Sequence, residues 1–244
     1  MTNNNKVVLF IDILGFAALT EAYPIDLDLL KTCDRPLSPS HNIDTILALS
    51  RNQLARTFTS FHASLGATLN LANMRHPLTA ITFSDSAFIA TTYAYEAVNI
   101  AIDRLHALLP QKIPVRMGIA YGSFAALRFK SEIMSDGGDH AAQFLGTAIV
   151  RAHAAETCGI KGLRILLHPS VIPLFDDNRH NPESTGRKHP ILYLECSEKE
   201  RTNKIGVHHE IDYWHLRPTS EADAWHAFQD MWNEAPQSVY EHYE

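Results

Sequence analysis

Apolar residues in this chain follow two patterns, short uninterrupted runs and longer stretches with helical spacing. The run Val7–Ile11 is typical of a strand that is buried on both faces. From Ile43 to about Met74, and again from Tyr95 to Leu109, apolar residues recur every three or four positions, which predicts two amphipathic helices. The whole pattern predicts these elements in chain order: strand 7–11, a short helix ending near Glu21, helix 43–74, strands 78–83 and 87–92 around a turn at 84–86, helix 95–109, strands 115–121 and 125–129, helix 141–157, strand 163–167, helix 170–175 and strand 191–196.

This order of elements predicts an α+β fold in which helices cover one mainly antiparallel sheet. Strand 125–129 is expected to pair back on strand 115–121, and residues 131–139 to form a polar loop. We expect one domain over residues 1–196, and we interpret the proline-containing stretch 23–44 as an irregular insertion. Residues 197–244 are interpreted as a C-terminal elaboration packed on the same domain.

Composition narrows the class of protein. The chain has 244 residues and a formal net charge of −6, which argues against a general nucleic-acid surface or stable membrane association, since both need a basic excess. Three cysteines without paired spacing indicate reduced thiols. No apolar stretch reaches the ~18 residues of a membrane span, so we expect a cytoplasmic protein.

Two aspartates carry the candidate chemistry. Asp12 ends the first strand, and Asp85 lies in the turn of the hairpin, so the two converge if their strands are neighbours. Adjacent carboxylates repel each other unless a cation lies between them. Magnesium takes oxygen ligands, commonly one or two carboxylates together with substrate phosphates. Taken singly, Asp12 is equally well interpreted as a helix cap and Asp85 as a turn residue bonded to its own backbone.

Two other interpretations have weaker support. Gly137-Gly-Asp-His140 is superficially similar to the GGDEF signature of diguanylate cyclases, but the full signature is absent. The fourteen histidines, His208 and His209 among them, show no HExxH or HD-type spacing of a metal-dependent hydrolase.

Five segments, in order, resemble the catalytic domain of class III adenylyl and guanylyl cyclases. Together they span roughly residues 6–196. The resemblance implies a ferredoxin-like, palm-type fold. The segments and the family patterns they resemble are Phe10–Phe16 (FxDIxGF), Phe83–Phe88 (the second metal segment), Val115–Gly122 (VRxGIxxG), Phe144–Glu156 (GxxVNxAxRxE) and Gly159–Leu167 (the strand that follows).

The resemblance implies a site for two Mg²⁺ or Mn²⁺ ions and a nucleoside triphosphate. By this likeness Asp12 and Asp85 bind the metals, with the Ile13 carbonyl as a further ligand. The backbone amides of Leu14, Gly15 and Phe16 would receive phosphate oxygens. Arg116 falls where the family has an arginine on the triphosphate, although a strand arginine in a surface ion pair is an alternative. Arg187 or Lys188 could also close over the phosphates.

The base-reading and transition-state positions depart from the family. Ile81 replaces the lysine of adenylyl cyclases, and Gln143 replaces their aspartate. Val150 and Ala154 replace the asparagine and arginine that orient the ribose and stabilise the transition state. Arg151, one turn before Ala154, is the candidate substitute.

These departures make the chain similar to the bacterial pyrimidine cyclases of anti-phage defence, with UTP favoured over CTP. The family resemblance also implies a homodimer, in which Gln143 and Arg151 act opposite the aspartates of the other subunit. Two alternatives stay open, a catalytically inactive module that binds nucleotides or dimerises, and a purine cyclase.

Overall fold

The computed structural model describes residues 4–25, 51–130, 140–176, 191–193, 206–213 and 221–234. Most of the predicted insertion at 23–44, the start of helix 43–74 and the loop at 131–139 lie outside the described residues. Arg187 and Lys188 lie outside them as well. Among the described helices, none is both long and apolar enough to cross a membrane.

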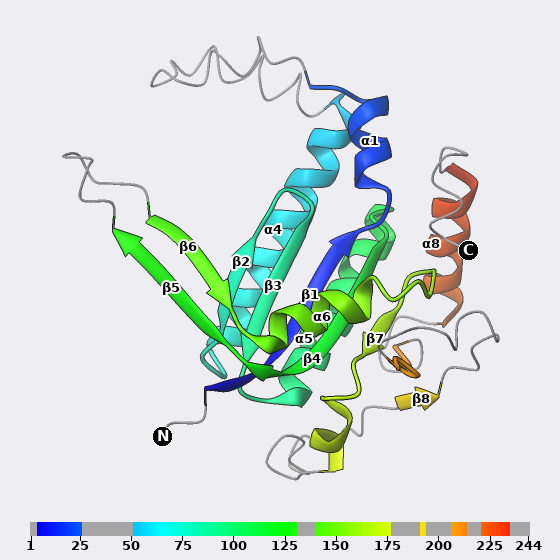
Figure 1. Cartoon of the computed structure of the whole chain (residues 1–244). Coiled ribbons are helices and arrows are strands. Elements are labelled where there is room, and N and C mark those ends of the chain that lie inside the picture. The colour runs from blue at the N-terminus through cyan, green and yellow to red at the C-terminus, as the bar shows by residue number, and fades with distance from the viewer. Residues whose placement is uncertain are drawn as a thin grey trace.

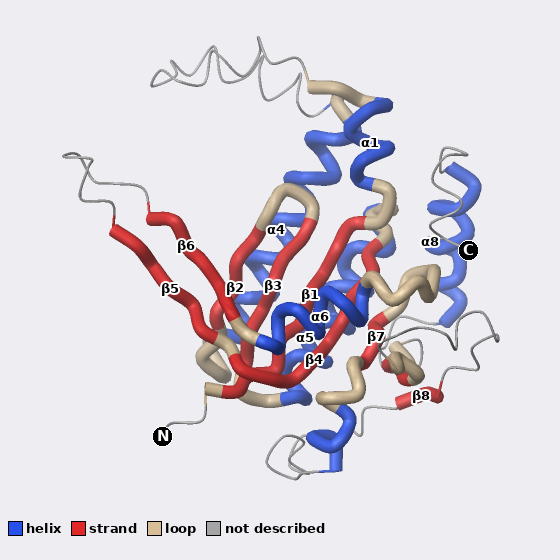
Figure 2. Tube along the Cα trace, viewed as in Figure 1, coloured by secondary structure: helices blue, strands red, loops and turns tan. Residues whose placement is uncertain are grey.

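A seven-stranded sheet forms the centre of the molecule, in the order β2-β3-β1-β4-β7-β9-β8 (Figures 1 and 2). Only the β4–β7 pair is parallel among the pairs of this sheet in the described residues; the others are antiparallel. This confirms the α+β prediction of a mainly antiparallel sheet. The strands are β1 (Asn5–Ile13), β2 (Thr79–Thr82), β3 (Ser86–Thr91), β4 (Val115–Ser123), β7 (Ile165–Leu167), β8 (Ile191–Tyr193) and β9 (His209–Ile211).

Alternation along β1 divides the core between the two faces of the sheet. Its odd-numbered residues, such as Leu9 and Ile11, join the main core with side chains of helices α4 (Gln53–Asn73) and α5 (Ala94–Leu108). Its even-numbered residues Val8 and Phe10 join a second cluster with helix α6 (Thr147–Glu156). Burial on both faces explains why this strand is continuously apolar in sequence.

The remaining helical segments are short or peripheral. They are α1 (Phe16–Ala22), the 3₁₀ turns η2 (Leu109–Gln111) and η3 (Ile172–Asp176), and α8 (Glu221–Glu234). The short helix after β1 and the hairpin β2–β3 are confirmed as predicted. Helix α5 ends before Pro110, also as predicted, and the chain then continues into η2.

Two predictions for residues 125–157 are wrong. Strand β5 (Ala125–Lys130) does not pair with β4 but with β6 (His140–Leu145), in a separate two-stranded sheet that extends away from the main one (Figure 1). The predicted helix 141–157 therefore begins only at Thr147. Gly146 ends the strand with φ 139°, and a side chain there would clash with the Ser123 carbonyl.

The C-terminal part contributes to the main sheet. Strand β9 lies between β7 and β8, pairing Leu167 with His209 and Tyr193 with His209. Helix α8 packs against η2 and the segment that follows β1. Residues beyond 196 thus supply an inner strand of the same sheet.

Candidate active site

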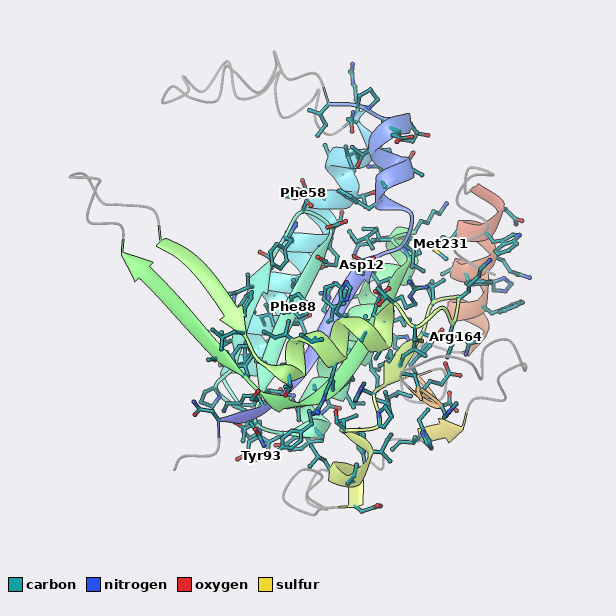
Figure 3. All side chains as sticks on the ribbon, in the orientation of Figure 1. Asp12, Phe58, Phe88, Tyr93, Arg164 and Met231 are labelled. Carbon is teal, nitrogen blue, oxygen red and sulfur yellow. The ribbon has the colours of Figure 1, made fainter. Side chains whose placement is uncertain are left out.

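The two predicted metal-binding aspartates meet at one end of the sheet. Strands β1 and β3 are neighbours, with Asp12 opposite Ser86. The Ile13 amide donates to the Asp85 carbonyl at 3.0 Å, which joins the end of β1 to the hairpin turn. As an even-numbered residue of β1, Asp12 lies on the face covered by α6 (Figure 3).

Negative charge is concentrated around Asp12. The pKa of its carboxyl is raised from 3.8 to about 7, by burial above all and then by the carboxylates of Glu156 and Asp85, while Arg116 lowers it. Glu156, at the end of α6, is 2% exposed. The charge on Asp12 is therefore only partly compensated by the protein itself.

These groups fit a divalent cation that shares its ligands with a substrate. Within the described part of the chain, no set of three or more His, Cys, Asp or Glu side chains is arranged to hold a metal ion. Two carboxylates and a carbonyl suit Mg²⁺ or Mn²⁺, which commonly bind few protein groups and complete their shell with phosphates and water. A cation here would relieve the repulsion that raises the pKa of Asp12.

The turn after β1 is tightly fixed. Gly15 adopts the left-handed conformation (φ 72°) and precedes the first residue of α1. The Leu14 amide donates to the Pro114 carbonyl at 2.9 Å, so it is already bonded within the chain. Of the three backbone amides expected to donate to phosphate oxygens, this conformation therefore leaves those of Gly15 and Phe16.

Arg116 is bound to Glu156. Its Nε donates to Oε1 at 2.7 Å, its Nη2 lies 2.6 Å from the same oxygen, and its Nη1 donates to the Ile160 carbonyl at 3.4 Å. The Arg116 side chain is 16% exposed, so this is not an ordinary surface pair. The residue predicted to contact the triphosphate thus has an acidic partner in its own chain, beside Asp12.

An apolar strip borders the aspartates. Ile81 pairs with Phe88, and Phe88 pairs with Phe10, so the three residues form one row across the sheet, two positions along β1 from Asp12. The Phe10 and Phe88 rings stack with centroids 4.4 Å apart. The predicted base-pocket residue Ile81 therefore lies on the same sheet face as Asp12. Gln143 lies on β6 opposite Leu127, in the separate two-stranded sheet.

The structure does not bring Arg151 to Asp12 within one chain. Its Nη1 donates to the Tyr121 carbonyl at 2.9 Å. On β4, Tyr121 is five positions from Arg116, which is opposite Asp12, so roughly 16 Å separate the two rows. The outward face of α6 instead presents Val150, which is 68% exposed.

Three polar residues near the aspartates were not predicted. The helix motif ends at Glu156, but nothing in the sequence indicates that this residue pairs with Arg116. Ser84 Oγ donates to Asp85 Oδ1 at 3.1 Å, and His62 Nε2 on α4 lies 3.2 Å from the Ser84 carbonyl. Nothing in the local sequence around His62 indicates this contact, since it depends on how α4 packs beside the hairpin.

Comparison with known proteins identifies the fold. No protein-family model matches the chain, and no curated protein matches it. A bacterial light-regulated adenylyl cyclase matches with a TM-score of 0.53 and 12% identity, over 93% of this chain and 56% of that one. An adenylate cyclase from Trypanosoma brucei matches with a TM-score of 0.52 and 13% identity, over 88% of this chain and 92% of that one. The chain spans just over half the length of the light-regulated enzyme, and it has the class III cyclase fold.

Proposed function

We propose that this chain is a metal-dependent nucleotidyl cyclase, which converts a nucleoside triphosphate to the 3′,5′-cyclic monophosphate and pyrophosphate. The observation that carries the proposal is the hydrogen bond from the Ile13 amide to the Asp85 carbonyl, which sets Asp12 and Asp85 together in a cyclase fold. The raised pKa of Asp12 is what an acidic site built for a cation has before the cation binds.

The chain's own groups would act mainly by positioning. Asp12, Asp85 and the Ile13 carbonyl would hold two Mg²⁺ or Mn²⁺ ions, which when bound neutralise the triphosphate and lower the pKa of the attacking hydroxyl. The 3′-oxygen then forms a bond to the α-phosphorus while the bond to the pyrophosphate oxygen breaks, and the hydroxyl proton passes to water or to pyrophosphate. The amides of Gly15 and Phe16 would orient the phosphates.

A homodimer would complete each site. The Arg151 guanidinium is bonded to the Tyr121 carbonyl, roughly 16 Å along β4 from the row of Asp12, so in this conformation it would assist only at the site of a second subunit. Three large apolar side chains are exposed on the hairpin, on β6 and on α6: Phe83 at 48%, Leu145 at 54% and Val150 at 68%. Their burial against a second copy would supply the interface.

A pyrimidine triphosphate is the proposed substrate, UTP first and CTP next. Ile81 lies beside Phe88 and offers no charged group to a base, and Gln143 in place of an acid can both donate and accept. By its resemblance to the pyrimidine cyclases of anti-phage defence, the product would be a second messenger in that response. The structural neighbours are equally compatible with a purine cyclase.

Product analysis tests the proposal. The purified protein is incubated separately with the four nucleoside triphosphates and Mn²⁺, and the products are identified by mass spectrometry. We expect cyclic UMP from the wild type and none from Asp12→Asn, while the exposed-site control Asp230→Asn keeps full activity. Cyclic AMP or GMP as the main product would overturn the pyrimidine assignment, and turnover that survives Asp12→Asn would overturn the metal site.

An inactive nucleotide-binding module is the second candidate. It is favoured by one observation, that the candidate cations Arg116 and Arg151 are both bonded within their own chain. In that case a triphosphate binds in the presence of Mn²⁺, as measured by calorimetry, and no cyclic product forms from any of the four.

A further inference from the structure

A small apolar cluster joins the C-terminal helix to the metal-binding end of β1. Its buried members are Leu14, Leu109, Leu163 and Met231, which are 5%, 2%, 7% and 2% exposed. This cluster is separate from the main core between the sheet and helices α4 and α5. Leu14 directly follows Ile13, so the first side chain after the proposed metal ligands is buried in the cluster that Met231 of α8 completes.

Helix α8 presents a single face to this cluster. Met231 belongs to the cluster, and Ala227, Phe228 and Trp232, at helical spacing from it, pack against the cluster. Gln229 is exposed, in keeping with a helix that is amphipathic rather than buried all round. Figure 3 shows Met231 on α8 at the same end of the sheet as Asp12.

Leu14 is held by the backbone as well as by its side chain. Its amide donates to the Pro114 carbonyl at 2.9 Å, while the amide before it reaches the Asp85 carbonyl at 3.0 Å. A shift of the Leu14 side chain would therefore be felt at both hydrogen bonds. The backbone hydrogen bonds fix the segment from the side of β4 and the hairpin. The Leu14 side chain fixes it from the other side, in the cluster that includes Met231 of α8.

We infer that α8 is a positioning element for the metal-binding segment, with Met231 holding Leu14 and thereby the Asp12–Ile13 end of β1. The inference rests on the proposed function, because that function makes this segment the metal-binding one. Protein interiors are close-packed and relax in part around a void, so we expect a void in this cluster to shift the turn at Leu14. A misplacement of about 1 Å at a catalytic segment can lower turnover by about 100-fold.

Local hydrogen exchange tests the mechanical part without any need for activity. In Met231→Ala we expect the Leu14 amide to exchange at least about 10-fold faster than in the wild type, as in a local opening. The Leu9 amide, in the middle of β1, keeps its protection. In Met231→Leu, which keeps the side-chain volume, exchange at the Leu14 amide should stay slow. Gln229→Ala, on the exposed face of α8, should leave the exchange rates of both amides unchanged.

Kinetics test the functional part with the same variants. Met231→Ala should lower kcat by about 10-fold to 100-fold with a smaller effect on KM, and Met231→Leu should recover most of it. Unchanged exchange at Leu14, or equal acceleration at Leu14 and Leu9 in both Met231→Ala and the milder Met231→Val, overturns the positioning role. A wild type that forms no cyclic nucleotide refutes the proposed function instead, and the exchange result is independent of that outcome.

Discussion

Replacing Asp12 by asparagine removes one negative charge from the acidic end of the sheet and keeps the size of the side chain. In the metal-free protein the carboxylate is destabilising, because burial and the neighbouring Glu156 and Asp85 raise its pKa to about 7. A carboxyl whose folded-state pKa is raised contributes stability that is present below its ordinary pKa of 3.8 and is lost as pH rises through about 7. We therefore expect Asp12→Asn to stabilise the metal-free protein at pH 8.

The size of the effect follows from the same shift. A change from 3.8 to about 7 corresponds to at most about 4 kcal/mol in the free energy of unfolding. Asp12 is only partly buried, so screening by water lowers the expected gain to about 1–2 kcal/mol. The gain should be small at pH 4 and should reach its full value above pH 7.

Urea unfolding in EDTA, followed by the fluorescence of the three tryptophans, measures the gain at both pH values. With added Mn²⁺ the wild type should become more stable than Asp12→Asn, because the ion stabilises only the wild type. The stabilisation is about 2.7 kcal/mol at a Mn²⁺ concentration 100 times its dissociation constant. Asp230→Asn, on the exposed side of α8, is the control and should change neither result. If Asp12→Asn destabilises the protein at pH 8, or gives the same gain at pH 4 and pH 8, the charge reasoning is wrong.

Three further predictions concern packing and assembly. Glu156→Ala leaves Arg116 without its acidic partner and should lower the free energy of unfolding in urea by about 3–5 kcal/mol. Glu156→Gln should lower it clearly less, and equal losses in the two variants would contradict the ion pair. Gly118→Ala places a methyl group against the backbone of α6 and should cost about 1–3 kcal/mol, whereas Gly66→Ala, in open space on a helix, should gain about 0.5–1 kcal/mol. Val150→Glu, at a 68% exposed position, should leave the far-UV circular dichroism spectrum unchanged but convert the proposed dimer to monomers in analytical ultracentrifugation; a dimer that persists argues for another interface.

Sequence alone predicts the parts of this fold that depend on local pattern. The strand over Val7–Ile11 is continuously apolar because both of its faces are buried, and the hairpin around Asp85 has turn residues between two short strands. The convergence of Asp12 and Asp85 follows once those strands are neighbours. The resemblance to class III cyclases supplied that neighbour relation, which no local pattern contains.

The errors lie where tertiary pairing overrides local preference. Residues 140–145 include Ala141 and Ala142, which favour helix, yet they form a strand because β5 offers a partner. Only Gly146, with its positive φ, indicates that the helix starts later than the apolar pattern suggests. At the site, the pairing of Arg116 with Glu156 joins positions 40 apart in sequence, so spacing cannot reveal it.

The order of strands at the edge of the sheet has a consequence for synthesis on the ribosome. Strand β8 pairs only with β9 among the described strands, and β9 comes later in the chain than β8. The newly made segment 191–193 therefore has no place in the sheet until residues 209–211 have left the exit tunnel and paired with β7. Until then the open edge at β7 is exposed to other chains, and translation speed over this stretch sets how long that exposure lasts.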